Sequence, residues 1–226
     1  MRPLVVYRDE DAQKDKSWIR FLLGRIRNNM NNLIVVTGRT GSGKSYSAIS
    51  ICEMISKVNK VPFTLDNIVF SLRDLMALIN SKKVKKGSCI IFDEPQISIS
   101  SREFQTEANK VFNYLVSTFR HRNLTLFFCT PYEDLLDKAS RKLFHAKFLV
   151  HSLNRNKNTC KIIPYFLDYN SALSKWFVKF LLVRFKDKKK QKYFTSKVKF
   201  WDIPKPSDSI SIPYEEKKKS FTTDLN

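Results

Sequence analysis

The stretch LIVVTGRTGSGKSYS, residues 33–47, decides how the chain folds. Its apolar beginning predicts a buried strand, and the octapeptide GRTGSGKS, from Gly38 to Ser45, matches the pattern G-x-x-x-x-G-K-[S/T]. Glycines let the backbone turn so tightly that its N–H groups can face a bound anion. A helix is expected to start at this loop and run to residue 58, and its positive N-terminal end adds to the anion site. A chance Gly/Ser turn before a helix is the alternative. Because strand, loop and helix follow in the required order, we interpret the stretch as a phosphate-binding loop.

The positions of this loop have distinct expected roles. Lys44 supplies a mobile positive charge for the β- and γ-phosphates, and the Ser45 hydroxyl is expected to ligate Mg²⁺. The residues predicted to bind the nucleotide are Gly38, Arg39, Thr40, Gly41, Ser42, Gly43, Lys44, Ser45 and Tyr46.

A second apolar run ends in two acids. Residues 88–96 read SCIIFDEPQ, which is typical of a buried parallel strand whose carboxyl end reaches an active site. We expect Asp93 to hold Mg²⁺ through water, and Glu94 to orient and polarise the attacking water. An Asp-Glu pair after an apolar strand is common by chance. Its position downstream of a phosphate loop favours the catalytic interpretation.

The chain is strongly basic. Its 226 residues carry a formal charge of +20, from 41 Lys and Arg against 21 Asp and Glu. From residue 141 onward there are 20 basic and 7 acidic residues, so most of the excess lies in the C-terminal part. Such an excess points to a polyanionic partner. A hydrophobic content of 42% argues against global disorder and is sufficient for a core.

The cysteines and the lack of a targeting or membrane segment predict where the protein is located. The four cysteines lie far apart, at Cys52, Cys89, Cys129 and Cys160. Without a CxxC pair or a partnered histidine, they are interpreted as buried thiols and not as a zinc site or disulfides. The N-terminus lacks a secretory signal, and the longest membrane-like segment, residues 176–185, is short and carries two charges. We expect no transmembrane span and a cytoplasmic location (the host cytoplasm for a viral protein), with transient contact at a virion portal or membrane.

Hydrophobic periodicity predicts the remaining elements of the core. Helices are expected at residues 16–27, 72–80, 103–119 and 132–144, and strands at residues 64–70, 124–129, 146–153 and 159–166. Ser71 followed by Asp74 is an N-cap signal for the second helix. Packing on the sheet is favoured over DNA contact for helix 16–27, because its apolar side chains recur at helical spacing. The basic loop 81–87 either touches DNA or is a solvated charge run.

The C-terminal segment interleaves basic and aromatic residues. Residues 175–192, KWFVKFLLVRFKDKKKQK, suit neutralisation of a nucleic-acid backbone and stacking on bases, and a solvated, partly disordered tail is the alternative. Residues 193–201 alternate like an exposed strand, and residues 203–226 are predicted to form an extended arm. The chain thus divides into a basic helical lead-in (1–32), a core (33–170) and a basic C-terminal extension (171–226). Alternating strands and helices predict an α/β fold, with a mainly parallel sheet and helices on both faces.

Three segments together resemble the FtsK–HerA superfamily of P-loop ATPases, the ring-forming motors that pump DNA, and within it the small archaeal viral genome-packaging and Zot-like ATPases. These segments are the phosphate loop (Walker A), residues 90–94 with the pair Asp93-Glu94 (Walker B), and residues 120–131, RHRNLTLFFCTP. The resemblance covers residues 33–150. It implies ATP and Mg²⁺ as cofactors and a RecA-like sheet of the ASCE branch, with an additional strand between the phosphate loop and the acidic strand.

The resemblance also implies nucleotide-sensing residues. Translocases of this superfamily have an arginine shortly before a strand that ends in a Thr-Gln sensor. Alignment on Thr130 implies that Arg120 is a finger reaching the γ-phosphate of a neighbouring subunit. Pro131 stands where the family commonly has glutamine, so the sensor is either Thr130 alone or Gln96. Rival fingers are Arg122, Arg102 and Arg141.

These features lead us to expect an ATP-hydrolysing translocase of double-stranded DNA. Its role would be that of a viral or plasmid packaging motor, working as a homo-oligomeric ring with a virion or membrane-associated partner. The alternative is a Zot-like morphogenesis ATPase that drives virion extrusion at a membrane. A third interpretation is a nucleotide-dependent DNA-binding or scaffold protein without turnover; Glu94 argues against it, because such a protein has less need of a positioned base.

Overall fold

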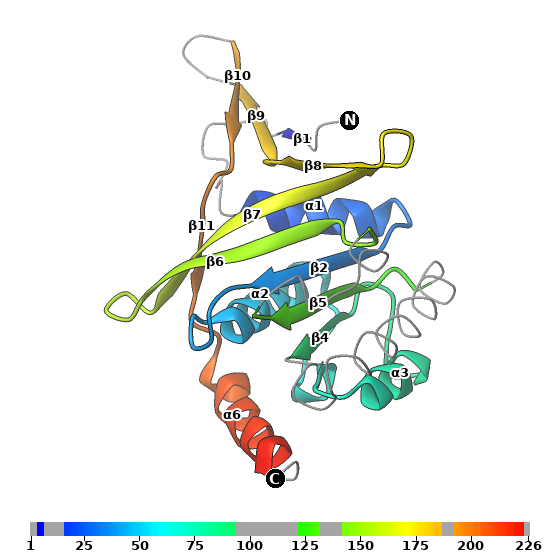
Figure 1. Ribbon diagram of the computed structural model, residues 1–226, viewed down its shortest axis with the longest axis vertical. Helices are drawn as coiled ribbons and strands as arrows, with labels where there is room; N and C mark the ends of the chain where they lie inside the picture. The colour runs from blue at the N-terminus through cyan, green and yellow to red at the C-terminus, as the bar shows by residue number, and fades with distance from the viewer. Residues whose placement is uncertain (1–3, 7–15, 94–121, 132–141, 187–191, 224–226) are drawn as a thin grey trace.

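Strand β2, Asn32–Thr37, lies inside an eight-stranded sheet in the computed structural model (Figure 1). The structure describes residues 4–6, 16–93, 122–131, 142–186 and 192–223. The strands follow the order β11-β7-β6-β2-β5-β4-β3, and β8 pairs with β7 off this path. Their bounds are β3 Ile68–Val69, β4 Cys89–Asp93, β5 Thr125–Thr130, β6 Ala146–Asn154, β7 Thr159–Asn170, β8 Lys175–Lys179 and β11 Trp201–Pro204.

Five neighbouring strands of this sheet run parallel. The pairs β3–β4, β4–β5, β5–β2 and β2–β6 are all parallel, whereas β7 is antiparallel to β6, and both β8 and β11 are antiparallel to β7. Strand β5 lies between β2 and β4, so it is the additional strand that separates the phosphate loop's strand from the acidic strand. The prediction of a mainly parallel sheet is confirmed, with an antiparallel set added on one side.

Helices cover both faces of the sheet. Because side chains alternate along a strand, Ile34 and Val36 of β2 enter one core cluster while Leu33 and Val35 enter the other. Helices α1 (Ser17–Arg27) and α2 (Lys44–Asn59) pack in the first cluster, and α3 (Leu72–Asn80) packs in the second. The chain therefore has the mixed α/β architecture expected from its sequence.

Helix α1 confirms the packing predicted for residues 16–27. Trp18 is fully buried, and its ring meets Phe148 of β6 edge to face with centroids 5.1 Å apart. Asn32, at the start of β2, donates from Nδ2 to the Leu22 carbonyl and to Thr125 Oγ1, at 3.1 and 3.0 Å. Arg25 Nε in turn donates to Asn32 Oδ1 at 3.0 Å. These bonds tie the helix to β2 and β5.

Two local predictions have different outcomes. Ser71 Oγ accepts the backbone N–H of Asp74 at 3.1 Å, so the N-cap predicted for α3 is confirmed. The strand predicted at residues 64–70 is wrong over most of its length. Residues Leu65–Asn67 form a 3-10 turn, because Asn67 Oδ1 accepts the N–H and hydroxyl of Thr64 and draws the chain into a turn. The helices predicted at 103–119 and over most of 132–144 lie outside the described residues.

The C-terminal segment is more structured than predicted. A three-stranded sheet has the order β1-β9-β10, with β1 Leu4–Val6, β9 Leu182–Lys186 and β10 Tyr193–Lys197. Strand β11 joins the large sheet, and helix α6, Asp208–Thr223, follows it (red in Figure 1). The extended arm predicted from residue 203 onward is therefore wrong. Pro213 and the serines obscured the helix, although its buried and packed side chains recur at helical spacing.

His145 links the start of β6 to β2 through a neutral ring. The ring Nδ1 accepts the backbone N–H of Leu33 at 3.1 Å, and the backbone N–H of His145 donates to the Leu33 carbonyl at 2.8 Å. Burial, together with the charge of Arg25, lowers the pKa of His145 from 6.5 to about 3. The unfolded chain therefore binds a proton more readily than the folded one, and folding is favoured less as the pH falls from 6.5 towards 3.

We expect His145→Gln to flatten this pH dependence, since glutamine keeps an acceptor for Leu33 N–H but does not titrate. Between pH 6.5 and about 4.5, the wild-type free energy of unfolding should fall more steeply than that of the variant, by at most about 1.4 kcal/mol per pH unit. Urea unfolding at a series of pH values measures the difference. Parallel curves for the two proteins would contradict a neutral, buried His145.

Candidate functional site

The loop between β2 and α2 needs glycine at defined positions. Gly38, Gly41 and Gly43 have φ of 154°, 73° and 95°, in the region that side chains disfavour. A Cβ on Gly38 would lie 2.9 Å from both Ser42 Oγ and Val150 Cβ. The sequence pattern is thus explained by the turn and by close packing against β6.

The loop delivers two functional side chains at the start of α2. Lys44 is buried, and its Nζ donates to the carbonyl of Arg39 at 3.2 Å, so the ammonium bends back over the loop. Ser45 follows on the same helical turn, while Ser47 N–H and Oγ both bond the Gly43 carbonyl, at 2.9 and 2.8 Å. The first turn of α2 thus begins at the loop, and its positive end faces the space that the loop encloses.

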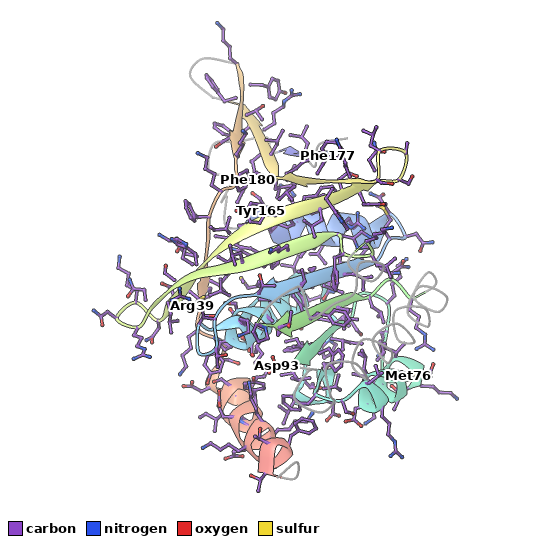
Figure 2. All side chains as sticks on the ribbon, viewed as in Figure 1. Arg39, Met76, Asp93, Tyr165, Phe177 and Phe180 are labelled. Carbon is purple, nitrogen blue, oxygen red and sulfur yellow. The ribbon has the colours of Figure 1, made fainter. Side chains whose placement is uncertain are left out.

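Asp93 meets Ser45 across the sheet. The carboxylate is fully buried at the end of β4, where Figure 2 labels it, and Ser45 Oγ donates to Oδ1 at 2.8 Å. Strand β5 lies between β4, which carries Asp93, and β2, which leads into the loop. The two residues therefore meet only because the loop carries Ser45 over the carboxyl end of β5. This is the pair predicted to hold Mg²⁺.

Helix α6 supplies two further contacts to Asp93 that sequence reasoning missed. Tyr214 donates from its hydroxyl to Oδ2 at 2.6 Å, and Lys218 Nζ lies 3.5 Å from the same oxygen. Burial, then the charge of Asp93, raises the pKa of Tyr214 well above its ordinary value, so the phenol stays protonated and acts as a donor. The spacing of four residues, which places both side chains on one helix face, was the available signal.

A cavity of about 400 Å³ opens beside these groups. Its lining includes Lys44 and Ser45 from the loop side, Arg155 and Cys160 from the β6–β7 hairpin, and Tyr214 and Lys218 from α6. Four cationic side chains, Lys44, Arg155, Lys205 and Lys218, thus border a space that also carries apolar walls. Such a combination suits an anionic ligand with a flat organic part.

The residues present fit a polyphosphate and its magnesium ion. Among the described residues, the buried Ser42 Oγ and Thr37 Oγ1 have no hydrogen-bond partner, and both belong to the loop and its strand. Within those residues no group of three or more His, Cys, Asp or Glu side chains could hold a metal, and Mg²⁺ in nucleotide sites needs only one or two protein oxygens plus phosphate and water. Ser45 Oγ would be the direct protein ligand, and the Asp93 carboxylate would hold the ion through water.

The remaining predicted site residues have mixed outcomes. Thr130 is buried at the end of β5, level with Thr37 of β2, which is the predicted position beside the acidic strand; its sensing role stays a prediction. Arg122 donates to the carbonyls of Ile79 and Ser81, at 2.5 and 3.3 Å, and so caps the end of α3. Glu94, Gln96, Arg102, Arg120 and Arg141 lie outside the described residues. All four cysteines are buried, as predicted.

A basic and aromatic surface lies on the strands beyond β7. Trp176, Phe177 and Val178 of β8 are exposed, and Figure 2 labels Phe177 on this strand. The exposed cations on or next to β8, β9 and β10 are Lys175, Arg184, Lys192, Lys197 and Lys199. None of the described helices is long and apolar enough to cross a membrane.

The sheet order, the glycine loop and the Ser45–Asp93 pair define a P-loop NTPase-like fold. No protein-family model and no curated protein matches the sequence. One similar solved structure is the N-terminal domain of zonular occludens toxin (Zot) from Neisseria meningitidis, with 18% identity over 71% of this chain and 96% of that chain and a TM-score of 0.40. This distant likeness transfers no residue role. Membership of the FtsK–HerA superfamily stays a prediction.

We expect Gly38→Ala to lower the free energy of unfolding by about 1–3 kcal/mol, because the added methyl meets Val150 and Ser42 at a positive φ. Chemical denaturation measures the change. Gly24→Ala is the matched control: it lies inside α1 with no atom within 4 Å of the new Cβ, and alanine there should add about 0.5–1 kcal/mol. Equal effects of the two substitutions would contradict the tight packing at Gly38.

Proposed function

We propose that this chain is an ATP-hydrolysing P-loop protein. The observation that carries the proposal is the 2.8 Å bond from Ser45 Oγ to the buried Asp93, beside the charged end of Lys44 and a cavity large enough for a nucleotide. A serine on the first turn of a phosphate-loop helix and the acid that ends β4, bonded to each other, are the pair that would hold the magnesium ion of a bound nucleotide.

The loop would bind the phosphates through its backbone N–H groups and through Lys44. The Lys44 ammonium would break its bond to the Arg39 carbonyl and contact the β- and γ-phosphates instead. Ser45 would ligate Mg²⁺ directly and Asp93 through water, and the bound ion would neutralise charge on the transferring phosphoryl group. Glu94, the next residue after β4, would take a proton from the attacking water. Thr130 would detect the γ-phosphate, and Arg120 of a neighbouring subunit would complete the site.

The work coupled to hydrolysis is, in this proposal, translocation of double-stranded DNA by a homo-oligomeric ring that packages a viral or plasmid genome. Support comes from the formal charge of +20 and from the exposed cations interleaved with aromatic side chains on β8 to β10. A motor that follows the phosphate backbone needs such charge and no base-specific contact.

The decisive measurement is the ATPase rate of mass-resolved oligomers with and without long duplex DNA, as a function of salt. We expect DNA to stimulate hydrolysis at low salt, and the stimulation to fall steeply as salt rises, because counterions compete for the same phosphates. Lys44→Ala should lose nucleotide binding or turnover. If duplex DNA neither binds nor stimulates hydrolysis at low salt, the translocase proposal is wrong.

Glu94→Gln separates binding from chemistry in the same assay. Its amide cannot accept the proton of the attacking water, so the variant should bind ATP while turnover collapses by about a hundredfold or more. Undiminished hydrolysis would remove Glu94 as the base and leave the nucleotide site intact.

The second candidate, a Zot-like morphogenesis ATPase at a membrane, is favoured by one observation. The β7–β8 hairpin exposes Leu173 and Val178, each 58% accessible, next to Trp176 and Lys175. Apolar and aromatic side chains beside lysines are typical of contact with an anionic membrane surface.

Flotation with anionic liposomes discriminates between the two candidates. Membrane attachment through the hairpin predicts that the chain floats and that Trp176→Ala with Val178→Ser abolishes flotation while ATPase activity stays unchanged. Chain that stays at the bottom of the gradient but binds duplex DNA would exclude the membrane candidate.

A further inference from the structure

Helix α6 encloses the carboxylate of Asp93. The hydroxyl of Tyr214, a side chain only 1% exposed, donates to Oδ2 at 2.6 Å while Ser45 holds Oδ1 at 2.8 Å. Lys218 brings its ammonium within 3.5 Å of Oδ2. One buried negative charge is therefore satisfied from within the chain by two hydroxyls and a cation.

These contacts occupy part of the carboxylate through which a magnesium ion would be held. Mg²⁺ keeps several of its waters, and a water bound to it must donate to Asp93. The Tyr214 hydroxyl already donates to Oδ2, and the positive charge of Lys218 repels a second cation nearby. Docked α6 and loaded magnesium thus compete for the same carboxylate.

The docked position of α6 is built by contacts outside the site. Phe221 stacks on Phe70, with ring centroids 5.1 Å apart, and Phe70 stacks in turn on Tyr214. Lys217 Nζ donates to the carbonyls of Ile68 and Leu65 beside β3, at 2.5 and 3.2 Å. Because Tyr214, Lys217, Lys218 and Phe221 share one face at helical spacing, the whole face docks as a unit.

Two features of α6 would allow it to undock from Asp93. It joins β11 through the short segment 205–207, where Ser207 bonds the carboxylate of Glu53 on α2. Pro213 lacks the N–H that would bond one turn back, so the helix is weakened immediately before Tyr214. A helix that is held by side-chain contacts, and that lacks one backbone hydrogen bond next to Tyr214, can move without disturbing the sheet.

We propose that α6 is a built-in plug of the magnesium side of this site, and that Tyr214 and Lys218 must withdraw from Asp93 before magnesium nucleotide binds. The proposal rests on the nucleotide site proposed above and adds its regulation. In the docked state the loop remains available to phosphates, whereas the metal position is closed. Whatever stabilises undocked α6 therefore activates the protein.

The test is the Mg²⁺ dependence of nucleotide binding by the full chain, followed with a fluorescent ADP analogue. Tyr214→Phe keeps the ring stacking and removes the donor, and Lys218→Met removes the cation. Each should lower the Mg²⁺ concentration for half-maximal binding by about tenfold, the scale of losing one hydrogen bond or ion pair to a carboxylate. Lys219→Met, an exposed lysine on the same helix, is the charge-matched control and should leave it unchanged.

Hydrogen exchange of residues 208–223 supplies a readout independent of affinity. In wild type, Mg²⁺ with nucleotide should accelerate exchange across α6, and nucleotide with EDTA should not. Equal Mg²⁺ requirements in wild type and in both variants, or a higher requirement in Tyr214→Phe, would overturn the plug. The proposed nucleotide site would stand in either case. Failure of wild type and every variant to bind nucleotide, with or without Mg²⁺, would instead overturn the nucleotide site.

Discussion

The structure depends on one buried charge, the carboxylate of Asp93. A buried carboxylate destabilises a fold by several kcal/mol unless donors and cations surround it. Ser45 of α2 and Tyr214 and Lys218 of α6 provide these partners, so a single side chain of β4 ties together a helix from the start of the core and the last helix of the described chain. The same carboxylate is the group that a magnesium ion would need. The contacts that stabilise docked α6 therefore also hinder magnesium from reaching Asp93.

The sheet explains why this meeting point exists. Parallel strands bring their carboxyl ends to one edge, and β2, β5 and β4 end there side by side. With β5 between the other two, Thr130 lies between the phosphate loop and Asp93, and the loop has to reach over it. Each of these residues comes from a different strand or helix, so the site forms only when the sheet order is complete.

The cavity at the phosphate loop and the exposed basic and aromatic residues lie in different parts of the molecule. The antiparallel strands added beyond β6 extend the sheet away from α3 and expose lysines and aromatic side chains, while α6 and the β6–β7 hairpin wall the cavity at the loop. Nucleotide and polyanion would thus bind at different places on the molecule. Such an arrangement suits a protein that converts nucleotide binding into movement of α6 and its neighbours.

The sequence by itself determined the phosphate loop, the acidic strand and the cap of α3, because each depends on neighbours a few residues apart: glycines at positive φ, an apolar strand ending in acid, Ser71 bonding Asp74. It did not reveal the 3-10 turn at Leu65–Asn67, and the arm expected after residue 203 proved to be α6. Only the tertiary structure decided that Tyr214 reaches Asp93, 121 residues away in the chain. The physical reason is that a buried charge is satisfied by whichever donor the completed fold brings near. Local periodicity does not predict which distant residue that donor will be.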